Sequence, residues 1–469
     1  MKKLLLCVGL VVLFASSTYA APVGPGGRIW VTRYANPQTV DNQLELLRYD
    51  VSTSWVTAQG SENEGAAVDN RYDLIGGSYP DRKARQYMSP EIYHPRANAD
   101  GTATGDSGEV LICHFPNVSP AVCRYTLVTP VTVSSATYSI LHPGTTSGAT
   151  ERTWANTAMS VVADVEGDAV GRPGGVLLSA MGGGYGIAWN DTDGNDDMTD
   201  DCDTYDKPGW NTGGPGDAEI GTLPNNSTGT KDCVWSVSDG LTANFYYLQY
   251  SGDYNTDHDW AGLATFYTTP AAQSSGWRFS ANGGFAVGDT DGDGNEDIYF
   301  LSTQLTGMWG AENYSITSPS IIRIADLSGN GHIDDPDNDI VKVIYNDDTL
   351  PGSDNNMGVG DCELIRDPTT GKWTLLVLYR GNSWTAVDGK VFAIELADNG
   401  DYAGTSDGVK TIISGIETGG GYGSNFPHEL HGMEFDADPG GVIPEPGTLL
   451  LIGTGVVGLF GYIRRRRMS

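Results

Sequence analysis

Alternating carboxylates fill a short loop in the second half of the chain. Acidic side chains stand at positions 1, 3, 5 and 9 of the stretch Asp289-Thr-Asp291-Gly-Asp293-Gly-Asn295-Glu-Asp297. Alternate side chains of such a loop turn inward, Gly294 at position 6 permits a sharp bend, and Asn295 would offer its backbone carbonyl. Negative groups this close repel one another unless a cation lies among them. The spacing therefore predicts a site for Ca2+ rather than a solvated acidic turn.

Two further stretches repeat the spacing with weaker ligands. The second loop has an Asp at each end, Ser and Asn between them, the carbonyl of His332 at position 7, and Asp337 at position 12: its predicted ligands are Asp326, Ser328, Asn330, His332, Asp334 and Asp337. A plain Asn-Gly turn is the alternative there. A third loop, with no Gly at position 6, leaves calcium and an acidic turn equally open; its candidates are Asp191, Asp193, Asn195 and Asp197.

The first loop continues into an apolar strand, Ile298-Tyr299-Phe300, where an EF-hand would continue into a helix. In this respect it resembles the FG-GAP calcium loops of integrin-like propellers and their bacterial relatives, and the second loop resembles a dockerin-type loop. The resemblance covers a short part of each repeat, and the loop at Asp289 is the complete copy. It implies structural calcium, held between the strands of a β-propeller.

The elements that must position these loops are short strands. Alternating apolar segments separated by Asn, Asp and Gly loops predict ten clear strands, and the chain between its two ends shows no long helical pattern. The ten strands are 28–34, 44–49, 109–115, 176–180, 242–250, 298–301, 321–324, 340–345, 374–379 and 390–396.

A repeat joins strands and loops. Four segments each have a strand ending in Asp and then an acidic or Gly-rich turn, around Asp164, Asp289, Asp361 and Asp436. Repeats of this kind predict an all-β fold, a β-propeller of about six or seven blades. The last copy breaks off at Gly441, so we expect the N-terminal strands to complete the C-terminal blade and bury its edge. One or more β-sandwiches are the alternative.

Both ends of the chain read as processing segments. A basic start, an apolar stretch and small residues before position 21 predict a signal peptide over residues 1–20, cut by signal peptidase. At the other end stand Pro444, Glu445 and Pro446, then 17 uncharged residues, then Arg464, Arg465, Arg466 and Arg467. At ~1.5 Å per residue the uncharged segment barely spans a ~30 Å hydrocarbon core, with the arginines on the cytoplasmic side.

This tail closely resembles the PEP-CTERM sorting signal of bacterial surface proteins. The resemblance implies cleavage by an exosortase after transient membrane anchoring, in a Gram-negative bacterium that makes exopolysaccharide. The predicted organisation is therefore a signal peptide (1–20), a propeller-like domain (21–441) and a sorting signal (442–469). The mature protein would lie at the cell surface or in the extracellular matrix.

Net charge indicates which classes of partner the protein can bind, and the cysteines indicate which disulfides it can form. The formal net charge is −32, and removing both ends takes away six basic residues and one acid, so the remainder is more negative still. Such a chain repels nucleic acid and anionic membrane surfaces and attracts cations. In an oxidising compartment disulfides are expected. The favoured pair is Cys113 with Cys123, and a weaker pair is Cys202 with Cys233, which leaves Cys362 over.

Two functions fit these observations. The first is a non-catalytic binding or structural component, stabilised by calcium and associated with exopolysaccharide. The second is a secreted lyase or glycosidase acting on polysaccharide, with calcium as a structural ion. No nucleophile, phosphate-loop or nucleotide-binding motif favours catalysis. Release of reducing ends or unsaturated products from a panel of polysaccharides would separate the two.

Overall fold

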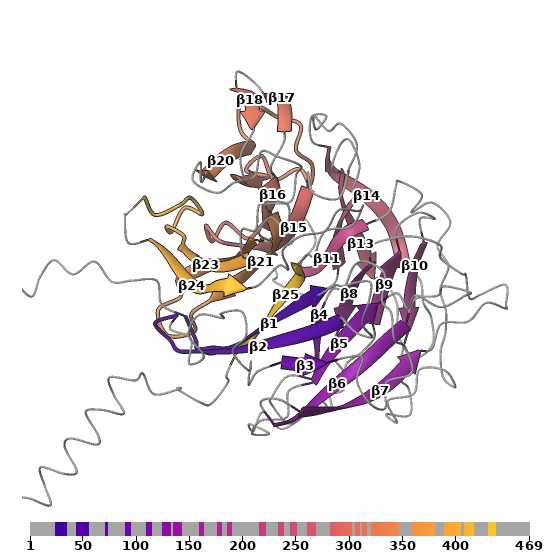
Figure 1. Cartoon of the computed structure of the whole chain (residues 1–469). Helices are drawn as coiled ribbons and strands as arrows, with labels where there is room; N and C mark the ends of the chain where they lie inside the picture. Colours follow the sequence, from indigo (N-terminus) through magenta and orange to yellow (C-terminus); the bar gives the residue numbers. More distant parts are fainter. Residues whose placement is uncertain are drawn as a thin grey trace, which may run out of the picture.

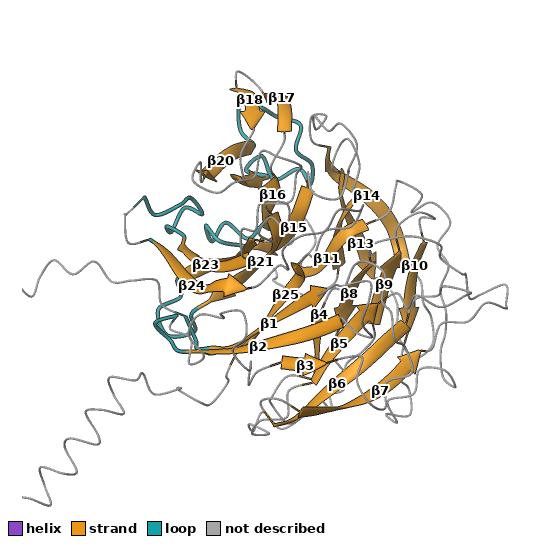
Figure 2. Ribbon diagram, in the orientation of Figure 1, coloured by secondary structure: helices purple, strands orange, loops and turns teal. Residues whose placement is uncertain are grey.

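The computed structural model describes part of the chain between residues 24 and 437. The described residues are 24–34, 44–55, 71–73, 90–94, 109–114, 124–132, 135–142, 159–163, 176–180, 185–189, 215–221, 233–238, 244–250, 260–268, 282–302, 305–309, 312–316, 320–346, 359–379, 389–404, 408–416 and 430–437. Within them every regular element is a strand, which confirms the all-β class (Figure 2). No helix in these ranges is long and apolar enough to cross a membrane, and the predicted signal peptide and tail lie outside them.

The strands form six antiparallel sheets and one hairpin, which follow one another around the molecule in chain order (Figure 1). In spatial order the first three sheets are β25 (Leu430–Ala437), β1 (Gly27–Tyr34), β2 (Leu44–Val51) and β3 (Arg71–Asp73); β4 (Pro90–His94), β5 (Glu109–His114), β6 (Arg124–Thr132) and β7 (Ser135–His142); and β10 (Tyr185–Trp189), β9 (Val176–Ala180) and β8 (Met159–Ala163).

The other three sheets follow the same plan. They are β11 (Pro215–Gly221), β12 (Cys233–Ser238), β13 (Asn244–Tyr250) and β14 (Trp260–Thr268); β15 (Asn282–Gly288), β16 (Asp297–Ser302), β19 (Ser320–Ala325) and β20 (Ile340–Asn346); and β21 (Val359–Arg366), β22 (Trp373–Tyr379), β23 (Gly389–Glu395) and β24 (Val409–Ile416). The hairpin of β17 (Leu305–Trp309) and β18 (Glu312–Ile316) is inserted between β16 and β19. All ten predicted strands are present, with ends that agree within two residues.

The last strand of the chain pairs with the first. β25 runs antiparallel to β1, with Arg28 opposite Asp436 and Trp30 opposite Glu434. The side chain of Thr32 accepts a hydrogen bond from the backbone N–H of Gly432 at 3.0 Å. The N-terminal strands therefore complete the C-terminal sheet, as the truncated repeat predicts.

Each sheet contacts the next through one of its edge strands, which we call its leading strand. These strands are β4, β8, β11, β15, β21 and β25; each contacts its successor, and β25 contacts β4. The hydrophobic core lies between neighbouring sheets. Leu47 and Val391, for example, belong to one buried cluster between the first and last sheets, and Phe245 and Phe300 belong to another. Each sheet buries its two faces against the sheets on either side. The apolar side chains that recur along the strands therefore pack between neighbouring sheets.

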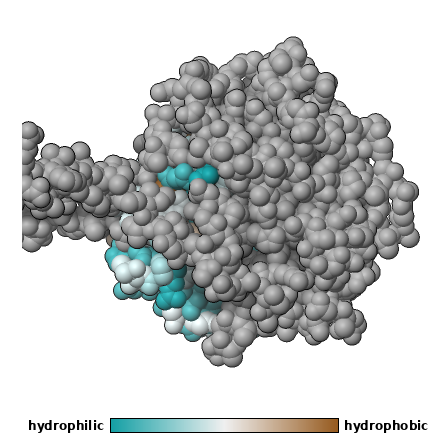
Figure 3. All heavy atoms as spheres, turned by 90° about the horizontal axis from the view of Figure 1, so that it is seen from below, coloured by the Kyte–Doolittle hydropathy of each residue, from teal (hydrophilic) through white to brown (hydrophobic). Residues whose placement is uncertain are grey.

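One face of the molecule carries the loops of interest. Antiparallel register brings Gly288, Asp297 and Ala325 to the same end of their sheet. We call this end the turn face, defined by residues 52–55, 289–296, 326–339, 367–372 and 397–404. Contacts between sheets confirm that it is shared, because Arg323 bonds to Asn399 and Lys410 bonds to the carbonyl of Ser54. In the view from below, the described atoms at the surface are mainly hydrophilic or neutral (Figure 3).

Candidate metal centre

The first acidic loop leaves β15 after Gly288 and returns to β16 at Asp297. It turns sharply because Gly292 and Gly294 have positive φ angles of 77° and 92°, which a side chain would disfavour. The carboxylate of Asp289 closes the turn: its Oδ1 accepts from the N–H of Gly292 at 2.8 Å and its Oδ2 from that of Gly294 at 3.2 Å. Glycine spacing and a leading carboxylate thus fold the loop locally.

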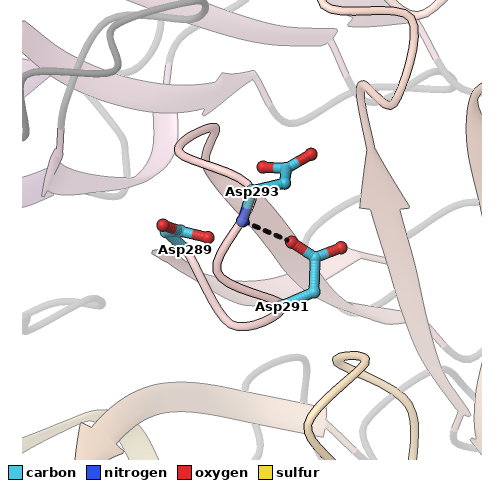
Figure 4. Close-up of side chains that lie close together, drawn as sticks. All are labelled: Asp289, Asp291 and Asp293. Carbon is cyan, nitrogen blue, oxygen red and sulfur yellow. Dashed lines mark hydrogen bonds between the residues drawn. The ribbon is translucent and has the colours of Figure 1, made fainter.

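Three carboxylates converge in this loop. Oxygen atoms of Asp289, Asp291 and Asp293 all lie within 4.8 Å of one another (Figure 4). Asx-type bonds orient the last two, since Asp291 accepts from the N–H of Asp293 and Asp293 from that of Asn295. Burial and the nearby charge of Asp291 raise the pKa of Asp293, while the N–H of Asn295 opposes them. Three oxygen donors at this spacing suit a hard cation such as calcium.

The fourth predicted carboxylate, Asp297, points elsewhere. It accepts from the backbone N–H of Thr290 at 3.2 Å and from the hydroxyl of the same residue. Arg323 of β19 donates to it from Nη2 at 2.8 Å and from Nε at 3.1 Å. Burial raises the pKa of Asp297 to about 7, and the charge of Arg323 counteracts that rise. The structure thus groups Asp297 with Arg323 rather than with the three converging acids.

The second acidic loop is organised around a buried carboxylate. Asp326 accepts from the N–H groups of Gly329 at 2.7 Å and Gly331 at 2.6 Å, and from the hydroxyl of Ser328 at 2.8 Å. The amide of Asn330 donates to Asp334 at 2.9 Å. Four predicted ligands therefore lie in one hydrogen-bonded loop. Within the described residues, however, the convergence of three carboxylates seen at Asp289 is not repeated here.

The acid that closes the second loop is Asp339, which the spacing rule missed. Its carboxylate accepts from the N–H groups of Ser328 at 3.1 Å, Asp334 at 3.0 Å and Asp335 at 2.9 Å, and its side chain is 6% exposed. The predicted Asp337 is exposed instead, and its own N–H donates to Asp335. An EF-hand loop is closed by an acid at position 12. Asp339 stands two positions later and directly precedes β20.

The remaining predicted residues have other placements. The ring of His332 lies with Nδ1 3.0 Å from the carbonyl of Thr265 on β14, which ties the second loop to the preceding sheet. The third loop, Asp191, Asp193, Asn195 and Asp197, lies outside the described residues. So do Cys123 and Cys202, and with them both predicted disulfides, although the backbones of Cys113 and Cys233 belong to β5 and β12. Cys362 is a buried thiol.

The tail matches a known sorting signal. Residues 442–467 match the PEP-CTERM protein-sorting motif, two residues short of the predicted boundary at the C-terminal side. The match identifies an exported protein that is sorted to the envelope of Gram-negative bacteria through exosortase processing. The match covers the tail. No curated protein matches the sequence.

Several solved structures share weak similarity with the chain. A candidate 6-phosphogluconolactonase from Bacteroides fragilis has 12% identity and a TM-score of 0.38, with 90% of this chain and 99% of that chain covered. Its counterpart from Bacteroides uniformis has 11% identity, a TM-score of 0.37, and coverages of 88% and 99%. A glycoside hydrolase family 43 arabinoxylan arabinofuranohydrolase from Bacillus subtilis has 10% identity, a TM-score of 0.28, and coverages of 68% and 68%. At these TM-scores the similarity assigns neither fold nor function to this chain. Its architecture is defined by its own strand pairing.

Proposed function

We propose that this protein is a calcium-stabilised component of the cell surface or extracellular matrix. In this proposal it binds or supports exopolysaccharide and performs no catalysis. The observation that carries it is the convergence of Asp289, Asp291 and Asp293 on one partly exposed turn of an exported, acidic protein. Sites of ~10⁻⁴ to 10⁻³ M affinity suffice for calcium outside the cell.

The proposed scaffold is a closed six-bladed propeller with FG-GAP-like loops. Support comes from the six sheets, from the contacts that lead from β4 through β25 and back to β4, and from the pairing of β25 with β1. A closed ring of blades leaves only short, protected strand edges. Calcium at the turn between β15 and β16 would fix two strands of one blade relative to each other.

Processing completes the proposal. Signal peptidase would remove residues 1–20, the tail would hold the protein transiently in the membrane, and exosortase would release residues 21–441 as the mature domain. The −32 net charge suits an extracellular matrix where divalent cations link acidic groups, and it disfavours nucleic acid as a partner.

Thermal unfolding tests the calcium site. Addition of calcium to the purified domain is expected to raise its melting temperature, chelation to lower it, and magnesium to have little effect, because Mg²⁺ sheds its water reluctantly. At free calcium tenfold above Kd the stabilisation is about 1.4 kcal/mol. The double substitution Asp291→Asn, Asp293→Asn removes two charges with little change of shape and should abolish most of the shift.

Asp337→Asn is the matched control, because Asp337 is an exposed acid on another turn of the same face. The control should keep the full calcium response. A wild-type melting temperature that ignores both calcium and chelator would remove the proposed site.

A further inference from the structure

A buried arginine stands between the acidic loop and the neighbouring sheet. Arg323 projects from β19, and its side chain is 2% exposed. Its Nη2 donates to Asp291 at 2.7 Å and to Asp297 at 2.8 Å, and its Nη1 donates to the backbone carbonyl of Asn399. One guanidinium therefore joins a candidate calcium ligand to the turn 397–401, which follows β23 in the next sheet.

A second, uncharged bridge runs beside the first. The hydroxyl of Tyr299 lies 2.6 Å from that of Thr290, inside the acidic loop, and donates to the backbone carbonyl of Gly400 at 2.6 Å. Burial raises the pKa of Tyr299 far above its usual range, so the hydroxyl stays protonated and remains a donor. Loop and turn are thus connected through two different side chains.

The turn approaches so closely that a side chain would not fit. Gly400 has a φ of 75°, and a Cβ built there would lie 2.5 Å from Cζ of Arg323 and 2.6 Å from Oγ1 of Thr290. Both the conformation and the space require glycine. The turn 397–401 therefore packs directly on the guanidinium, and a shift of either one must displace the other.

Charge balance explains how an arginine can lie beside a cation site. Asp297 lies buried against Arg323, so the guanidinium has a carboxylate partner that is not one of the three converging acids. Asp291 is shared: its Oδ1 accepts from the N–H of Asp293, and its Oδ2 accepts from Arg323. The rigid guanidinium fork fixes the direction in which Asp291 presents its carboxylate.

Resting on the calcium site proposed above, we propose that Arg323 is its positioning residue and that the junction couples calcium binding to the turn 397–401. Calcium at Asp289, Asp291 and Asp293 fixes Asp291, which fixes Arg323, which holds the carbonyl of Asn399. The neighbouring sheet thereby responds to an ion that none of its residues touches. Coupling between sites in proteins commonly amounts to fivefold or more in affinity, and it is reciprocal.

The first test uses a substitution outside the ligand set that changes no charge. Tyr299→Phe removes the hydroxyl that joins Thr290 to Gly400 and leaves the three acids and Arg323 in place. We expect calcium affinity, measured by isothermal titration calorimetry, to fall about fivefold. Tyr379→Phe is the matched control, since Tyr379 is a buried tyrosine that pairs with Val359 and Lys390, at the end of the neighbouring sheet far from the turn face. The control should bind calcium as the wild type does.

The second test reads the turn directly. Hydrogen exchange of the backbone amides at 397–401 should slow in wild-type protein when calcium is added, because bound ion stabilises the junction. Tyr299→Phe and Arg323→Lys should lose this protection at calcium concentrations that saturate each variant. Lysine keeps the charge but lacks the fork that reaches Asp291, Asp297 and Asn399 together. If Arg323→Lys does not fold, Tyr299→Phe alone decides.

The outcomes separate two failures. If wild-type protein does not bind calcium at all, the proposed function fails and the coupling falls with it. If it binds calcium but exchange at 397–401 is unchanged, or if Tyr299→Phe binds and protects as the wild type does, the site stands and the coupling is overturned.

Discussion

At the scale of single residues, the number of backbone N–H groups that reach a carboxylate distinguishes the acids of the second loop. Asp339 accepts from three N–H groups and is buried, whereas no N–H bond to the carboxylate of the exposed Asp337 is among the described contacts. A buried group that loses its partner leaves the matching donors without a bond, which costs about 1–3 kcal/mol per group. The two acids stand two residues apart and should differ sharply on substitution.

Asp339→Ala should therefore lower the free energy of unfolding by about 3 kcal/mol or more, because three N–H groups, those of Ser328, Asp334 and Asp335, each lose their acceptor. Asp337→Ala is the control and should change it by less than about 0.5 kcal/mol, as for other surface positions. Urea unfolding in the presence of chelator separates this effect from any bound ion. Equal losses in the two variants would contradict the assigned role of Asp339.

At the scale of elements, the alternation of apolar and polar residues predicted strands. Contacts between residues that are distant in the sequence could not be predicted in this way. Period-two apolar patterns located all ten predicted strands, because each strand buries side chains against neighbouring sheets. Spacing also singled out Asp289, Asp291 and Asp293, whose carboxylates lie close together. It gave no sign of the ion pair of Asp297, because Arg323, the partner that holds this acid, is 26 residues away and approaches from another strand. Likewise, the length of a loop decides which acid closes it. The fixed EF-hand spacing points to Asp337 and therefore does not find Asp339.

The strand β25 carries an acid whose charge opposes folding. Glu434 is half-buried by exposed area. Burial first, and then the charges of Asp361 and Asp436, raise its pKa well above the usual value. A raised carboxyl pKa favours the protonated, folded state, so the contribution to stability is full below about pH 4.5 and is lost as pH rises through the folded-state pKa. Wild-type protein should therefore lose stability over this interval.

Glu434→Gln removes the titration at nearly constant shape. The free energy of unfolding, measured by urea denaturation from pH 4.5 to 8, should decline less with pH in the variant than in the wild type. The difference between the two should grow toward pH 8, in favour of glutamine. Parallel curves for the two proteins would mean that Glu434 titrates alike in both states.

At the scale of the whole molecule, the two ends of the described fold meet. Gly27 pairs with Ala437, so β1 begins where β25 ends, at the turn face. The segment before Gly24 and the sorting tail after Ala437 therefore leave the fold from neighbouring points. Removal of either segment leaves every pair of this sheet in place. The position of β25 between β1 and β21 makes it the element on which the junction of first and last sheets depends.

Two truncations measure that dependence. A chain that ends at Gly441 retains β25 and should unfold at the temperature of the full chain, because the tail beyond it is predicted to pack on nothing. A chain that ends at Glu429 lacks Met433 and Phe435, which are buried against Trp55 and the last sheet, and it exposes the edge of β1. Open edges with apolar faces associate, so this chain should aggregate or elute as a larger species in size-exclusion chromatography.

If instead the chain that ends at Glu429 stays monomeric and melts normally, β25 does not join the two ends. If the chain ending at Gly441 also loses stability, the tail is part of the fold, and its removal by an exosortase would destabilise the mature protein.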